Sequence, residues 1–178
     1  KSKNNLKRKN SKIKSLINYE KLLEIRNLKY IHNTNNQGIR NINFSIRRPS
    51  LLILFGKSGS GKSTLLDLIA GTLIPQEGEV VLFRNKNQLQ PKISYLHQEY
   101  SLFDTSIAEN IAFGISKEKI DLKKLRKVLI QAEIYDYVSK LKNNIHELVG
   151  ENGCNLSTGQ KQRIALARAL YFEPDLLL

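Results

Sequence analysis

One glycine-rich segment constrains the fold of this chain more than any other feature. Gly56-Lys57-Ser58-Gly59-Ser60-Gly61-Lys62-Ser63 fits the pattern G-x-x-x-x-G-K-S/T at every position. Five apolar residues, 51–55, run into it, and a helix-favouring stretch follows it without a breaker until Gly71. We therefore predict a strand buried on both faces, then a loop, then a helix.

This segment has the chemistry of a phosphate cradle. Glycines let the backbone curl until successive N–H groups point into one concavity, and the helix N-terminus adds partial positive charge there. Lys62 can reach the outer phosphates of a nucleotide, and the Ser63 hydroxyl is a hard oxygen ligand suited to Mg²⁺. The alternative is that this segment is an ordinary glycine-rich turn that matches the motif by chance. The strand and the helix expected on either side of it make this alternative less favoured. Phosphate binding alone does not separate kinases, GTPases and motor ATPases.

Strands and helices alternate along the rest of the chain, which predicts an α/β fold with a parallel sheet. The block 104–155 has helical patterns and no clear strand, so we expect a helical insertion or subdomain there. Asp121 is the expected cap of its longest helix. The expected strands lie at 22–28, 42–46, 51–55, 79–83 and 93–96, with the opening of another at 176–178. The expected helices lie at 64–70, 122–132 and 135–141, and from 158 until Pro174 stops the last one.

Charge and cysteine content narrow the class of protein. Lys and Arg number 29 against 16 Asp and Glu, a net charge of +13. Residues 1–21 carry eight basic residues against Glu20 alone and read as a basic linker. This segment could be a solvated tail, a segment near an anionic membrane surface or an arm that binds nucleic acid. The third interpretation lacks the interleaved aromatic residues that stack on bases. The lone Cys154 excludes an internal disulfide framework, and no apolar run reaches the ~20 residues of a membrane span.

A second motif, Leu156-Ser157-Thr158-Gly159-Gln160, stands directly before a helix-favouring run. Ser157 and the N–H groups of Gly159 and Gln160 could hold an anion at the start of that helix. Read alone, the stretch could equally be an ordinary helix cap.

Together the two motifs resemble the ATP-binding domain of ABC transporters of the exporter type, over residues 22–178. LSTGQ is similar to the family signature LSGGQ, with Thr158 in place of a glycine. The resemblance implies a P-loop NTPase with a mostly parallel core sheet, a small antiparallel β-subdomain and a helical signature subdomain at about 104–157. It also implies ATP and Mg²⁺ as ligands. The implied ATP-binding residues are Tyr30, Gly56, Lys57, Ser58, Gly59, Ser60, Gly61, Lys62, Ser63 and Thr64.

The resemblance gives roles to three further positions. Tyr30 falls where the family has an aromatic that stacks on adenine, and Glu151 falls in a loop that faces the membrane domain. Gln98 falls at a position where the family has a glutamine that touches Mg²⁺ and the attacking water. The implied metal ligands are therefore Ser63 and Gln98, and the implied catalytic residues are Lys62 and Gln98. Without the resemblance, Tyr30 would be a strand-end aromatic, Gln98 a loop amide and Glu151 a turn residue. His97 departs from the family, which usually has proline there.

The resemblance implies an ATP-hydrolysing domain that powers export or flipping at the cytoplasmic face of the cell (inner) membrane. Its implied partners are a second ATP-binding domain, facing it head to tail, and a transmembrane domain on the same chain. A soluble ABC-type ATPase acting on nucleic acid or the ribosome is the alternative. The basic charge favours that alternative, whereas the absence of coiled-coil heptads between the motifs makes nucleic acid an unexpected partner.

The chain opens with Lys1 and contains no methionine, so we expect it to be part of a longer protein. The family's Walker B aspartate, catalytic glutamate and switch histidine would lie beyond Leu178. These residues alone are therefore expected to bind nucleotide weakly and to hydrolyse it negligibly. The transported substrate is not readable from the sequence.

Overall fold

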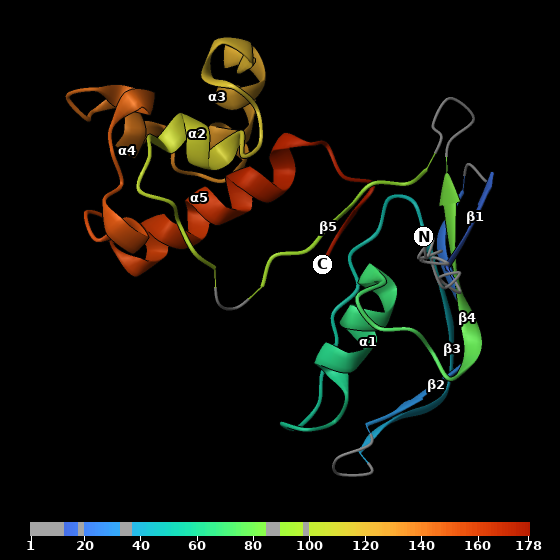
Figure 1. The fold of residues 1–178 in the computed structure, drawn as a ribbon. Helices are drawn as coiled ribbons and strands as arrows, with labels where there is room; N and C mark the ends of the chain where they lie inside the picture. Colours follow the sequence, from blue (N-terminus) through green and yellow to red (C-terminus); the bar gives the residue numbers. More distant parts are fainter. Residues whose placement is uncertain (1–12, 18–19, 33–36, 85–89, 98–99) are drawn as a thin grey trace, which may run out of the picture. The chain divides into compact units, whose positions relative to one another are not determined.

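The computed structural model describes residues 13–17, 20–32, 37–84, 90–97 and 100–178 (Figure 1). The chain divides into two compact units, Lys1–Pro91 and Lys92–Leu178. The first unit contains the glycine-rich loop and most of the strands, and the second contains the LSTGQ motif and most of the helices. In the described part of the chain, no helix has both the length and the apolar character needed to cross a membrane.

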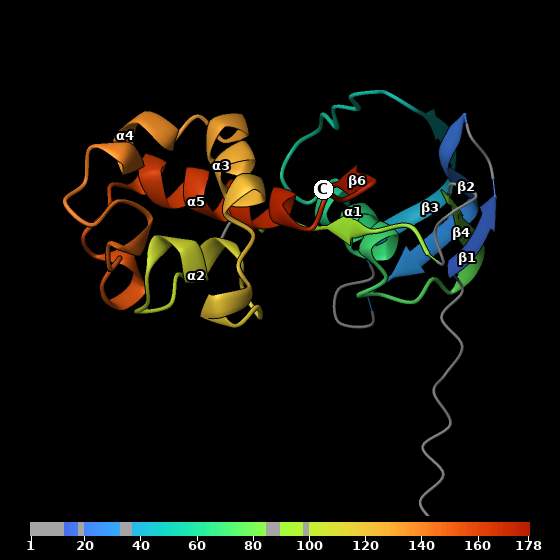
Figure 2. The same ribbon diagram turned by 90° about the horizontal axis from the view of Figure 1, so that it is seen from above.

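A mixed four-stranded sheet in the order β1-β4-β2-β3 forms the body of the first unit (Figure 2). Its central strand β2 (Lys21–Ile31) pairs antiparallel with both β3 (Gly38–Arg47) and β4 (Glu77–Arg84). Ile25 of β2 stands opposite Phe44 of β3 and Val80 of β4, and Ile25 and Val80 are buried. The small antiparallel sheet that the family resemblance implied is therefore present.

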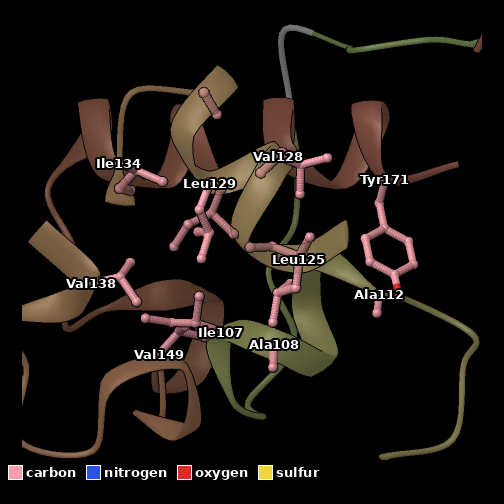
Figure 3. Close-up of a cluster of buried hydrophobic side chains, with 14 of the residues drawn as sticks. Ile107, Ala108, Ala112, Leu125, Val128, Leu129, Ile134, Val138, Val149 and Tyr171 are labelled. Carbon is pink, nitrogen blue, oxygen red and sulfur yellow. The ribbon is translucent and has the colours of Figure 1, made fainter. Parts of the chain in front are cut away.

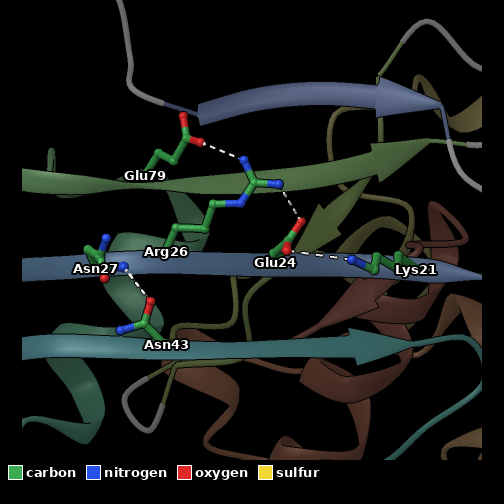
Figure 4. A network of polar contacts seen from close by, with 6 residues as sticks. All are labelled: Lys21, Glu24, Arg26, Asn27, Asn43 and Glu79. Atoms are coloured by element: carbon green, nitrogen blue, oxygen red, sulfur yellow. Dashed lines mark hydrogen bonds and ion pairs between the residues drawn. The ribbon is translucent and has the colours of Figure 1, made fainter.

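Polar side chains tie the strands together where β2 is irregular (Figure 4). Arg26 donates to Glu24 at 2.8 Å and, across the strands, to Glu79 at 3.1 Å. The hydrogen bond that Arg26 donates to Glu24 lowers the pKa of the Glu24 carboxyl. The next residue, Asn27, donates its backbone N–H to Oδ1 of Asn43 at 2.8 Å, beside a register shift in both ladders. The Asn43 side chain thus satisfies a backbone N–H at the point where the ladder is interrupted.

Part of the expected basic linker belongs to this sheet. Strand β1 (Ile13–Ile17) pairs in parallel with β4, from Ile13 opposite Val80 to Ile17 opposite Arg84. The edge of β4 that does not face β2 presents a row of backbone N–H and C=O groups, and β1 supplies hydrogen-bond partners for them. The structure thus places residues 13–17 in a strand, while the assignment of residues 1–21 as a basic linker stays a prediction.

The buried strand predicted over residues 51–55 is not formed. Leu51, Ile53 and Phe55 are 86%, 61% and 87% exposed, and none of the ladders among the described residues includes this segment. Apolar sequence alone does not make a buried strand, because such a strand needs partner strands at its edges and layers on its faces. In the first unit the four described strands pair with one another instead.

Consequently, the mostly parallel core sheet is not seen among the described strands. Their parallel pairs are β1–β4 in the first unit and β5 (Ile93–Ser94) with β6 (Leu176–Leu177) in the second. Strand β5 is shorter than the predicted 93–96, and β6 lies where the sequence predicted the start of a strand.

Helix α1 (Lys62–Ala70) begins directly after the glycine-rich loop, as the sequence predicts. Gly61 and Gly71 flank it in the left-handed conformation, and the N–H of Gly71 bonds back to the helix. Leu65, Leu68 and Ile69 are buried. The helix thus anchors the end of the loop in the core of the first unit.

The second unit is a helical cluster around the longest helix, α5 (Thr158–Tyr171). Its other α-helices are α2 (Ile107–Ile111), α3 (Leu122–Gln131) and α4 (Tyr135–Ser139). Three 3-10 turns connect the helices, at Lys117–Lys119, Asn144–His146 and Glu151–Gly153. Asp121 caps α3 as predicted, because its Oδ1 accepts from the N–H groups of Lys123 and Lys124.

The core of the second unit lies between α2, α3 and α5 (Figure 3). Ile107, Leu125, Leu129 and Ile134 are 2% exposed or less. Tyr171 at the end of α5 is buried as well, and its hydroxyl accepts the N–H of Asp121 at 3.1 Å. One side chain therefore links the end of α5 to the cap of α3.

Leu129→Ala is expected to reduce the free energy of unfolding by about 2–5 kcal/mol, because a buried side chain would be replaced by a cavity. The change is measured as a shift of the urea unfolding midpoint of the protein. The neighbouring Ile130→Ala is the matched control, since Ile130 is 53% exposed. Equal shifts for the two variants would contradict this packing.

Candidate functional site

The glycine-rich loop closes on itself ahead of α1. Ser60 donates its N–H to the carbonyl of Lys57 at 3.2 Å, and Leu65 donates to the carbonyl of Gly61 at 2.9 Å. Gly61 adopts a φ of 89°, which brings the chain from the loop directly into the helix. A side chain is strained at this φ, so glycine is needed at the point where the loop meets the helix.

The ammonium group of Lys62 lies inside this curl. Its Nζ donates to the carbonyls of Gly56 and Lys57, both at 2.8 Å, and to Oγ of Ser60 at 3.3 Å. All three partners are neutral oxygen atoms, so the positive charge remains available to an anion. The N-terminus of α1, with its own partial positive charge, begins at the same residue. The arrangement is that of an anion site built from one ammonium and a curled backbone.

The two hydroxyl residues after Lys62 are placed differently. Ser63 is exposed, whereas Thr64 is buried. Among the described residues, no group of three or more His, Cys, Asp or Glu could hold a metal ion. The Ser63 hydroxyl fits Mg²⁺ that takes its other ligands from phosphate and water.

Tyr30 and His32 form an aromatic pair at the end of β2. Their rings pack edge to face, with centroids 5.0 Å apart and planes at 81°. Nε2 of His32 lies 3.0 Å from Oγ1 of Thr64, in the first turn of α1. The strand end that carries Tyr30 therefore touches the helix that follows the glycine-rich loop.

His32 is a residue that sequence reasoning missed. Side chains at positions i and i+2 of a strand lie on the same face of the sheet. The assignment of Tyr30 to adenine stacking could therefore have identified His32 as its neighbour. Gln98, by contrast, lies outside the described residues, and its predicted role stays a prediction. The adjacent His97 packs on Tyr95, with ring centroids 4.1 Å apart.

The LSTGQ motif starts α5 in the second unit. Leu156 is buried, while Thr158 and Gly159 are exposed. Ser157 caps the helix: its Oγ accepts the N–H of Gln160 at 3.3 Å, and its own N–H bonds to Oε1 of Gln160 at 2.8 Å. The motif therefore is a helix cap, and its exposed middle leaves the start of a long helix accessible to an anion.

Glu151 is exposed at the beginning of the Glu151–Gly153 turn. Lys161 of α5 holds the turn by donating to the carbonyl of Asn152 at 2.9 Å. Gly153 is buried, and a Cβ on it would lie 2.9 Å from Leu102. The turn is thus fixed to α5 and presents Glu151 at the surface.

A buried polar hub in the second unit was not foreseen. Asn110 is 0% exposed, and its side chain bonds to the backbone N–H and C=O of Phe103, both at 2.9 Å. Arg168 of α5 donates to the carbonyl and Oδ1 of Asn110, at 2.7 and 2.9 Å, and to the carbonyl of Ser101 at 3.0 Å. Burial lowers the pKa of the Arg168 guanidinium. Only the fold reveals this hub, because it joins segments about 60 residues apart.

Above this hub lies an exposed aromatic pair. Phe103 and Phe113 stack with centroids 4.8 Å apart, and the Arg168 guanidinium lies 5.9 and 5.8 Å from the two rings. The rings are 47% and 51% exposed and help to line a cavity of about 420 Å³.

Comparison with known proteins gives concordant findings. The sequence model of the ABC transporter family matches residues 39–178. The chain is 36% identical to the glutathione/L-cysteine transport system ATP-binding/permease protein CydD of Bacillus subtilis, covering 88% of this chain and 28% of that protein. It is 34% identical to the ATP-dependent lipid A-core flippase of Pseudoalteromonas translucida, again covering 88% of this chain and 28% of the relative.

A solved structure of a bacterial Atm1-family ABC exporter with ATP bound is similar at a TM-score of 0.78 and 26% identity. The match covers 92% of this chain and 29% of that one. The chain therefore spans less than a third of the length of these relatives.

Proposed function

Because the chain belongs to the ABC transporter family and corresponds to the ATP-binding domain of its exporter-type members, we propose that it binds and hydrolyses ATP to power export or flipping by a membrane transporter. The observation that carries this proposal is the position of Lys62. Its ammonium lies in the curl of the loop, at the start of α1, with neutral partners that a phosphate can replace.

In this proposal the phosphates of ATP lie against the backbone N–H groups of residues 56–64. Lys62 exchanges the carbonyls of Gly56 and Lys57 for phosphate oxygens, which are stronger acceptors because they are charged. Ser63 and Gln98 are the residues that would hold Mg²⁺, and the ion supplies electrostatic stabilisation of the phosphoryl group when it is bound. Tyr30 stacks on the adenine base.

A second ATP-binding domain completes the site in the proposal. The loop around Lys62 surrounds the phosphates from one side only, and the exposed residues Thr158 and Gly159 offer the start of α5 to the phosphates held by another copy. A head-to-tail pair would thus place each ATP between the loop of one domain and the LSTGQ motif of its partner. Attack of water on the terminal phosphate would yield ADP and inorganic phosphate, and departure of that phosphate would remove charge from this interface and let the pair open.

The second unit offers a surface for a transmembrane domain. Glu151, Phe103 and Phe113 are exposed residues of this unit, and the cavity beside the two rings can accept a short apolar segment. CydD is named as an ATP-binding/permease protein. We therefore place the domain at the cytoplasmic face of the cell (inner) membrane, with a transmembrane domain on the same chain. A P-loop NTPase fold with a mostly parallel core sheet also belongs to this proposal.

The LSTGQ motif provides a test in the intact protein. Ser157→Asp keeps a side chain that caps α5 but adds a negative charge where a phosphate is expected. ATP turnover is expected to fall at least about tenfold, the effect of ~1.4 kcal/mol of repulsion. The unfolding temperature should stay near that of the unaltered protein.

Ser157→Ala is the matched control, because it removes the cap without adding charge. It should reduce the free energy of unfolding by about 0.5–2 kcal/mol and reduce turnover less than Ser157→Asp does. If Ser157→Asp hydrolysed ATP at the normal rate, the proposed role of the motif would be refuted.

A further inference from the structure

The glutamine side chain that precedes β4 continues the ladder between β2 and β4. The backbone pairs of these strands end at Lys29 opposite Glu77. One residue before Glu77, the amide of Gln76 accepts the N–H of Ile31 at 3.1 Å and donates to the carbonyl of Ile31 at 2.9 Å. The N–H of Gln76 also bonds to the carbonyl of Lys29, at 3.0 Å. The side-chain amide thus acts like an additional peptide group at the end of β2.

Ile31 lies between the two members of the aromatic pair. Tyr30 precedes it and His32 follows it, and the two rings pack edge to face. His32 in turn contacts the Thr64 hydroxyl, two residues after Lys62. The pair is therefore held at its backbone by Gln76 and at its far side by the first turn of α1.

We propose that Gln76 is a positioning residue of the nucleotide site, which fixes the end of β2 so that Tyr30 and His32 stand beside the phosphate loop. This inference rests on the proposed function, because it requires an adenine base at Tyr30. The end of a strand frays when its backbone groups lose their hydrogen-bond partners. An aromatic ring that becomes ordered only when the base binds stacks on it less favourably than a ring that is already in place, because the ordering costs entropy. Gln76 itself would touch no part of the nucleotide.

The test compares ATP with inorganic tripolyphosphate, a probe that has the phosphates but no base. Gln76→Met keeps the length of the side chain and removes both hydrogen bonds to Ile31. In the intact protein we expect ATP to bind about tenfold more weakly, as when a base loses a stacking partner. Tripolyphosphate affinity should stay unchanged, because the loop and Lys62 are intact.

Two further variants sharpen the result. Gln76→Glu retains the acceptor for the N–H of Ile31 but turns an acceptor instead of a donor toward its carbonyl, so its ATP affinity should also fall below that of the unaltered protein. Gln131→Met changes an exposed glutamine at the end of α3 and should alter neither affinity.

Equal losses for ATP and tripolyphosphate would overturn the proposal, because they would mean that Gln76 supports the phosphate loop as a whole. Unchanged ATP affinity in Gln76→Met would overturn it too. If the unaltered protein bound neither probe, the proposed function itself would fail. If it bound both equally well, phosphate binding would stand while the base contact, and this inference with it, would fall.

Discussion

Lys62→Ala is expected to abolish ATP hydrolysis by the intact protein and to weaken ATP binding by about a hundredfold or more. The variant loses charge-assisted hydrogen bonds to phosphate, each worth about 1.5–3 kcal/mol. The structure makes the effect specific, since the ammonium already lies within the loop and bonds to Gly56, Lys57 and Ser60. Calorimetric titration with ATP and a phosphate-release assay measure the two quantities.

Lys123→Ala serves as the control for charge, because Lys123 is an exposed lysine of α3 in the other unit. It should leave both ATP affinity and turnover within about twofold, as expected of an exposed surface substitution. Normal ATP affinity in Lys62→Ala would require the assignment of the phosphate site to be withdrawn.

Gly61→Ala is expected to have the second largest effect. The residue adopts a φ of 89°, and a Cβ there would lie 2.5 Å from Cγ2 of the buried Ile39 in β3. Backbone strain and overpacking together should cost about 2–4 kcal/mol of unfolding free energy. Because Gly61 joins the loop to α1, ATP affinity should fall with stability. Thermal unfolding and nucleotide titration measure the two effects.

Two companion variants separate the causes. Gly59 also has a positive φ, of 79°, but a Cβ on it would meet nothing within 4 Å, so Gly59→Ala should cost only the backbone term of about 1–2 kcal/mol. Ile39→Ala in the Gly61→Ala background should restore part of the lost ATP affinity by making room for the added methyl group. If Gly59→Ala and Gly61→Ala were equally harmful, contact with Ile39 would not be the cause.

The sequence by itself determined the features that depend on a few neighbouring residues. Helix α1 begins where the glycine-rich loop ends, Asp121 caps α3, and Ser157 of LSTGQ caps α5. Each of these follows from hydrogen bonds and backbone angles within about four residues, which is the range over which local chemistry acts. The family was readable for the same reason, since its two motifs are each continuous in the chain.

Only the tertiary structure decided features that join distant segments. Apolar residues 51–55 predicted a buried strand, yet they lie exposed, whereas 13–17 in a basic segment pair with β4. Strand formation depends on which edges are free, and the apolar pattern of one segment does not state this. The contacts His32–Thr64, Gln76–Ile31 and Arg168–Asn110 span 32, 45 and 58 residues. A hydrogen bond between groups that far apart in the chain exists only once the chain has folded, so the sequence could supply the groups but not their partners.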